Sequence, residues 1–188
     1  PSIDRYMSED LSIGYVGRTR LRVADVHAEH EKGDKGDSYG TLFRGVFIEA
    51  DFHKDFRTEL YLTPENYLKS ASMVFSSELG ERMDLENPDF EKAFVVFGQD
   101  PVEARYILTP DMQERLLFLK KVLGNNLRIT FKDSNVYIAT SINKDMFDPQ
   151  LSRPANCPEQ IKELTQQLAA CFHVVEVLDL NTRIWSKQ

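Results

Sequence analysis

Two alternating segments, separated by a glycine-rich and charged stretch, constrain this chain more than any other feature of its sequence. Apolar and polar residues alternate with a period of two across 19–29 and again across 41–52. Because successive side chains of a strand point to opposite faces, each segment is predicted to be a strand with one buried face. Residues 31–40, between them, are rich in glycine and charge and predict a loop.

Further strands are expected later in the chain. Residues 52–56 look like a tight connection into a strand over 58–62, so the first three strands suggest an antiparallel meander. The apolar run 94–97 is typical of a short buried strand. Alternation on both sides of Asp133-Ser134-Asn135 predicts a hairpin over 127–140.

Helix starts are marked by three caps that contain proline. Thr63-Pro64, Asn87-Pro88 and Thr109-Pro110 each place a side-chain acceptor before proline at the first helical position. The third leads into a long helix over about 110–123. A C-terminal helix is predicted from Pro158 to about 178, although its last turns also fit a strand. Its apolar stripe comprises Ile161, Leu164, Leu168, Phe172 and Val175.

The order of these elements predicts a single α+β domain over residues 1–188. It would have a largely antiparallel sheet, a mid-chain helix and a C-terminal helix, and a pleckstrin-homology-like barrel with a terminal helix is the alternative. A chain of 188 residues buries about 70% of its unfolded surface, so it needs no disulfide or metal to fold. Cys157 and Cys171 would lie about 21 Å apart on one helix, so both are expected to be free thiols in a reducing compartment.

Composition and motifs exclude several classes of function. The formal net charge of −7 argues against bulk binding of nucleic acid, which needs a basic surface. No apolar stretch approaches the ~20 residues that span a bilayer. The glycine patterns that hold nucleotide phosphates are missing, and no cofactor is expected. These observations favour a protein that is not an enzyme.

Three segments, 41–56, 90–110 and 180–185, resemble a bacterial family known as domain of unknown function 3137. The run EARYILTP, residues 103–110, is the most specific part of this resemblance. Members of the family often carry membrane-spanning segments upstream of the domain. The resemblance therefore implies the cytosolic part of a protein of the bacterial inner membrane. The family brings no established activity and no catalytic residues.

One segment has the residue types of a metal site. Glu49, Asp51, His53 and Asp55 follow one another at a period of two, and carboxylates with imidazole hold divalent ions. Asp51 and His53 are the best candidates for such a site. An ordinary solvent-exposed strand face is favoured over a metal site, because these residues lie on the polar side of an amphipathic strand and His53 belongs to the predicted turn.

Charged residues at two other places are candidates for binding a ligand or partner. Arg18, Arg20 and Arg22 would share one face and could meet lipid phosphates or an acidic partner, or pair with acids across the sheet. Arg105 could anchor a carboxylate or phosphate. The favoured interpretation of Glu103 and Arg105 is an ion pair that orients a strand-to-helix turn.

The sequence favours an interaction or ligand-binding module in the bacterial cytosol, tethered to the membrane in the full-length protein. Its partner would be a protein or a small molecule, with a membrane surface as a further possibility and no nucleic acid. A metal-assisted hydrolase that uses the Asp51 and His53 region is the alternative, and a structural oligomerisation domain is the third.

Overall fold

A computed structural model describes residues 3–32, 38–52, 56–65, 79–141, 154 and 156–180 of the chain. The strands are β1 (Arg5–Val16), β2 (Thr19–Glu31), β3 (Tyr39–Asp51), β4 (Leu60–Thr63), β5 (Glu81–Met83), β6 (Val95–Gly98), β7 (Arg128–Lys132) and β8 (Asn135–Ser141). The helices are α2 (Pro88–Ala93), α3 (Pro101–Ile107), α4 (Pro110–Leu123) and α5 (Pro158–Val177). The centre of the predicted loop after β2 and most of the helix predicted after Thr63 lie outside these ranges.

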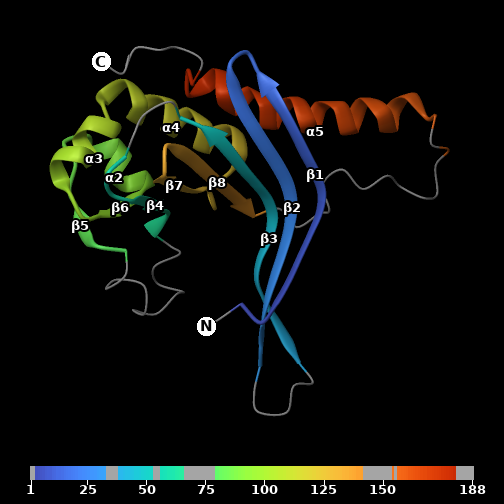
Figure 1. Cartoon of the computed structure of the whole chain (residues 1–188), viewed down its shortest axis with the longest axis horizontal. Coiled ribbons are helices and arrows are strands. Elements are labelled where there is room, and N and C mark those ends of the chain that lie inside the picture. Colours follow the sequence, from blue (N-terminus) through green and yellow to red (C-terminus); the bar gives the residue numbers. More distant parts are fainter. Residues whose placement is uncertain are drawn as a thin grey trace.

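The described strands form one antiparallel sheet in the order β1-β2-β3-β8-β7-β4-β6-β5, which confirms the α+β class (Figure 1). The sheet is open, with β1 and β5 at its two edges, so the alternative of a barrel is wrong. The predicted meander is also wrong at its third strand. The β7–β8 hairpin lies between β3 and β4, because β3 pairs with β8 and β4 pairs with β7.

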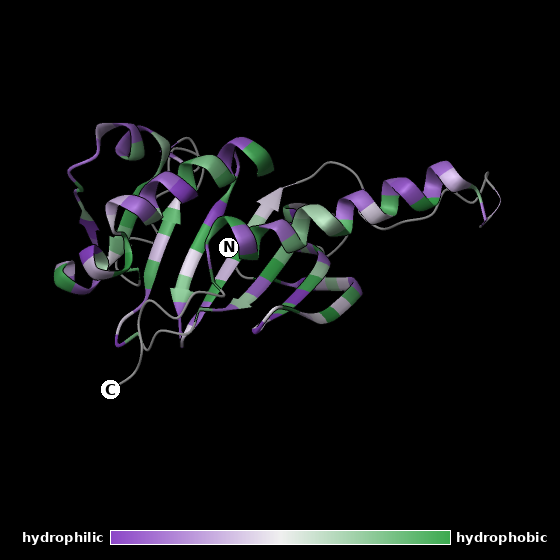
Figure 2. Cartoon of the chain, turned by 90° about the horizontal axis from the view of Figure 1, so that it is seen from above, coloured by the Kyte–Doolittle hydropathy of each residue, from purple (hydrophilic) through white to green (hydrophobic). Residues whose placement is uncertain are grey.

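The helices pack on one face of the sheet and form a single core with it (Figures 1 and 2). Inward residues of the central strands, such as Ile48 on β3 and Ile138 on β8, are 1% and 0% exposed. Leu116 and Leu119 of α4 and Val174 of α5 cover them from the helix side. This burial fixes the pairing register of the strands, because a slip of one residue would turn the apolar side chains of a strand from the core to solvent.

Caps containing proline begin the helices that the structure describes between β5 and β7. Asn87 and Thr109 accept hydrogen bonds from backbone amides of α2 and α4, as their sequence patterns predict. Asp100 caps α3 in the same way, with Pro101 at the first position. α3 was not predicted from the sequence, and the segment expected to be a strand-to-helix turn is instead a helix that carries Glu103 and Arg105.

The N-terminal half of α5 projects beyond the rest of the fold (Figure 2). Cys171, Val174 and Val175 in its second half are at most 3% exposed, and the segment is helical to Val177. Ile161, expected on the buried stripe, is 51% exposed. The prediction of a continuous buried stripe is wrong there, because the projecting turns extend past the sheet that would cover them. Within the described residues, no helix is long and apolar enough to span a membrane.

Strand β1 was not expected from the sequence. It pairs with β2 through a two-residue turn in which Gly17 has a φ of +62°. A bulge between Glu9 and Ser12 inserts one extra residue, and Asp10 within it has a φ of +52°. The extra residue shifts the phase of the alternation, so the period-two pattern breaks in the middle of the strand.

The aromatic cluster at one end of the core gives a test of this packing. Phe131 is 0% exposed, and its ring lies 5.1 Å from the ring of Phe52 and 5.9 Å from that of Phe56. We expect Phe131→Ala to lower the free energy of unfolding by about 3–5 kcal/mol, because it leaves a cavity among these rings. Urea denaturation measures the change. Phe118→Ala on α4 is the control, since Phe118 is 49% exposed. Equal losses in the two variants would contradict this packing.

Candidate functional site

The predicted arginine face is placed on β2, where acidic side chains of β3 accompany it. Arg18 lies in the turn before β2, and Arg20 and Arg22 share the sheet face that the helices leave open. Arg22 Nη1 lies 3.1 Å from Glu49 Oε2, and the two residues are directly opposite in the β2–β3 register. The shallow hollow beside them is lined by Arg20, Arg22, Glu49, Asp51, Ser134 and Asn135. Arg22 therefore pairs with an acidic residue across the sheet, which is one of the alternatives that the sequence predicted for this arginine face.

The candidate metal pair is only half described. Asp51 ends β3 and faces the hollow that Arg20 and Arg22 line, whereas His53 and Asp55 lie outside the described residues. In the ranges that the structure describes, no group of three or more His, Cys, Asp or Glu side chains could hold a metal ion. The Asp51 and His53 site stays a prediction.

Glu103 connects α3 to the segment that enters β4. Its carboxylate accepts hydrogen bonds from the backbone amides of Arg57 at 2.7 Å and Thr58 at 2.8 Å, and also from the Thr58 hydroxyl. The expected pairing with Arg105 is replaced by these bonds. Arg105 is exposed and lines a separate hollow beside Arg82. Glu103 thus has a structural role, in holding the start of β4 against α3.

This role of Glu103 predicts a loss of stability without the charge. We expect Glu103→Gln to lower the free energy of unfolding by about 1–3 kcal/mol, because charge-assisted bonds to two backbone amides become weaker or are lost. Arg105→Ala on the same helix is the matched control and should change it by no more than about 0.5 kcal/mol. Chemical denaturation compares the two. A larger effect of Arg105→Ala would indicate that Arg105 is the structural residue.

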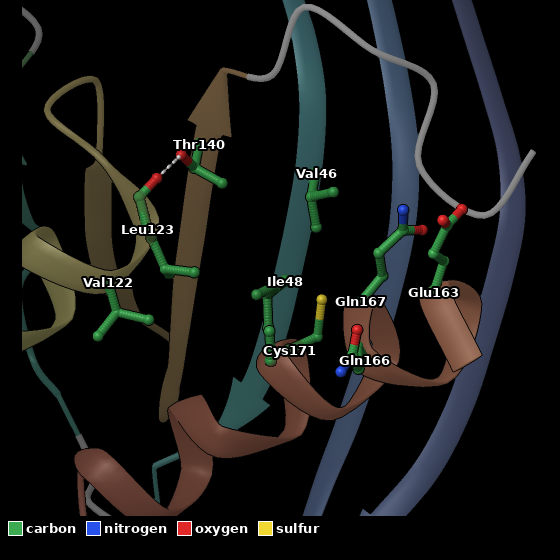
Figure 3. Close-up of a pocket in the computed structure, with 10 residues that line it drawn as sticks. Val46, Ile48, Val122, Leu123, Thr140, Glu163, Gln166, Gln167 and Cys171 are labelled. Carbon is green, nitrogen blue, oxygen red and sulfur yellow. Dashed lines mark hydrogen bonds between the residues drawn. The ribbon is translucent and has the colours of Figure 1, made fainter. Parts of the chain in front are cut away.

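An apolar groove of about 420 Å³ lies between α4, α5 and the middle of the sheet (Figure 3). Its apolar lining consists of Val46 and Ile48 from β3, Val122 and Leu123 from α4, and Ala170 and Cys171 from α5. Glu163, Gln166 and Gln167 of α5 provide its polar side. We refer to this hollow as the α5 groove.

Local features of α4 and α5 shape the α5 groove. Gly124, with a φ of +102°, ends α4 so that Val122 and Leu123 stop at the mouth of the groove. Thr140 Oγ1 donates a 2.8 Å hydrogen bond to the Leu123 carbonyl, which ties the end of α4 to β8 (Figure 3). On α5, the small side chain of Ala170 leaves space where a larger residue would fill the hollow.

Cys171 gives the groove a thiol that stays protonated. The side chain is 3% exposed, and burial raises the pKa of the thiol to about 11. Both cysteines are free, as the sequence predicts, but Cys157 is only half buried at the start of α5. The thiolate is the reactive form, so Cys171 contributes apolar surface to the groove rather than a nucleophile.

The raised pKa of Cys171 predicts slow alkylation with a defined dependence on pH. In Cys157→Ser protein, we expect the rate of modification by iodoacetamide to rise about tenfold for each pH unit between 7 and 9. The reason is that the thiolate fraction rises tenfold per unit when the pH lies well below the pKa. Mass spectrometry measures the rate, and Cys171→Ser protein, which keeps Cys157, is the comparison. A rate for Cys171 that levels off below pH 9 would contradict the raised pKa.

The fold and the groove define an α+β domain with an apolar concave surface. A profile of the family described as "Protein of unknown function (DUF3137)" matches residues 41–180. The chain belongs to this family, as the resemblance in the sequence indicated. No curated protein matches the chain.

A search of solved structures finds the mycobacterial trehalose monomycolate transport factor A, TtfA. The identity is 10%, the TM-score is 0.40, and the match covers 92% of this chain and 88% of the chain in that structure.

The α5 groove was not found by reasoning from the sequence. Its residues come from four separate elements, β3, β8, α4 and α5, and none of them carries a recognisable motif. The apolar stripe predicted on α5 does not point to the groove, because none of its members lines the hollow: Ile161, Leu164, Leu168, Phe172 and Val175.

Proposed function

We propose that this chain is a non-enzymatic binding module, and that its ligand site is the α5 groove. The observation that carries this proposal is a hollow of about 420 Å³ with an apolar lining drawn from three elements. Small-molecule sites have volumes of about 300–1,000 Å³, and they combine a mostly apolar lining with a few polar groups. The α5 groove has this size and this composition.

The lining favours an apolar ligand with an uncharged polar end. Gln166 and Gln167 supply amide groups that can donate and accept hydrogen bonds. Glu163 is the charged residue of the lining, so an anionic head group would meet repulsion there. An acyl chain or another elongated apolar molecule, ending in a hydroxyl or amide group, fits both properties.

The roles of the charged residues support binding over catalysis. Arg22 pairs with Glu49, and Glu103 holds backbone amides. Cys171 has a pKa far above neutrality. Arg22, Glu49 and Glu103 stabilise the sheet or its connections and do not line the α5 groove, whereas the Cys171 thiol that lines the groove stays protonated. We further propose that the module works in the bacterial cytosol and is tethered to the membrane, where apolar ligands are abundant.

A pair of neighbouring alanines tests the groove. Ala170 lines it, whereas Ala169 is also exposed on α5 but is not part of the lining. We expect the protein to bind the neutral dye Nile red, and Ala170→Trp to weaken that binding at least tenfold because the indole occupies the hollow. Tenfold corresponds to about 1.4 kcal/mol. Fluorescence titration measures the dissociation constant.

Ala169→Trp is the matched control and should keep the wild-type affinity. Circular dichroism during heating verifies that both variants stay folded. Equal weakening in the two variants, or no binding of the dye by the wild-type protein, would contradict the α5 groove as an apolar ligand site.

A further inference from the structure

Strand β1 presents an apolar stripe at the edge of the sheet. Leu11, Ile13 and Tyr15 are 54%, 56% and 71% exposed, and they alternate with partly buried Ser12, Gly14 and Val16. Ile13 lies opposite Arg22 and Tyr15 opposite Arg20, so the stripe belongs to the sheet face that the helices leave open. Among the described strands, β1 pairs only with β2, and its other edge faces outward (Figure 1).

This edge has little of the protection that edge strands usually carry. In natural proteins, charged side chains, proline or a short length prevent edge strands from pairing with another chain, because the unpaired backbone groups of an edge can bind a further strand. Residues 11–16 contain neither charge nor proline, and β1 is 12 residues long. The bulge at Asp10 interrupts the edge at one end of this segment, and the turn at Gly17 ends it at the other. The open part of the edge is therefore the short segment 11–16.

We propose that the 11–16 edge pairs with the same edge of a second copy of this chain. The argument is that the segment is complementary to itself in antiparallel orientation. With Ile13 on the two-fold axis, Ile13 meets Ile13 of the other copy, and Leu11 meets Tyr15. Residues directly opposite in an antiparallel pair share a face, so all of these apolar contacts form on the same side.

The charges at the two ends of the segment fit this register. Glu9 and Asp10 precede it, and Arg18 follows it. Antiparallel pairing about Ile13 places Asp10 of one copy opposite Val16 of the other. Arg18 of the second copy then lies two residues beyond Val16, as a diagonal neighbour of Asp10, and the two-fold symmetry repeats this arrangement at the other end of the segment. A symmetric contact of this kind closes on itself and gives a dimer with one continuous sheet.

The interface would be small. Strand pairing over about six residues buries less than the 1,200–2,000 Å² of a standard stable interface. The dimer is therefore expected to dissociate in the micromolar range. This inference does not depend on the α5 groove, which lies on the other face of the sheet.

Sedimentation velocity across a concentration series from micromolar to millimolar tests the dimer. We expect the wild-type chain to shift from monomer to dimer, and Ile13→Lys to stay monomeric because it places two like charges opposite each other. Ile161→Lys is the control, since Ile161 is 51% exposed on α5 and should leave the dimer intact. A monomer at every concentration, or a dimer that survives Ile13→Lys, would overturn the proposal.

Cysteine cross-linking in Cys157→Ser protein tests the register. Opposed residues have Cβ atoms about 4.5–5.5 Å apart, close to disulfide range, so Ile13→Cys should form a disulfide dimer under mild oxidation. Leu11→Cys should not cross-link to itself, because the two cysteines would lie about 14 Å apart. A mixture of Leu11→Cys and Tyr15→Cys should cross-link. A mixture that cross-links no better than Leu11→Cys alone would rule out this register.

Discussion

The insertion of the β7–β8 hairpin into the centre of the sheet is the constraint on which the rest of the structure depends. Ile138 of β8 is opposite Ile48 of β3 on one side and Ile129 of β7 on the other. These residues are at most 1% exposed, so each of the two ladders is fixed by burial as well as by hydrogen bonds. The hairpin thereby joins the long strands β1–β3 to the short strands β4–β6 in one sheet.

The position of the β7–β8 hairpin also determines where the α5 groove lies. β3 and β8 bring Val46, Ile48 and Thr140 under the helices, and the hydrogen bond from Thr140 to Leu123 fixes the end of α4 above them. α5 crosses the same region with small side chains at Ala170 and Cys171. The α5 groove is thus a consequence of how the helices end over the central strands.

Arg22, Glu49 and Glu103 are charged residues that hold elements of the fold together. Arg22 and Glu49 join β2 to β3, and Glu103 joins α3 to the segment before β4. The two surfaces that we propose for a ligand and a partner are apolar: the α5 groove on the helix side and the β1 edge. Apolar surfaces of this kind support the binding and assembly roles that we propose.

The sequence by itself determined the elements whose signals are local. Alternation predicted β2, β3, β7 and β8, and capping residues before proline predicted α2 and α4. It missed α3 although Asp100-Pro101 carries the same cap, and it missed β1 because the bulge at Asp10 shifts the alternation. Only the tertiary structure decided the strand order, the partners of Glu103 and the α5 groove. These depend on contacts between residues far apart in the chain, which neither periodicity nor capping encodes.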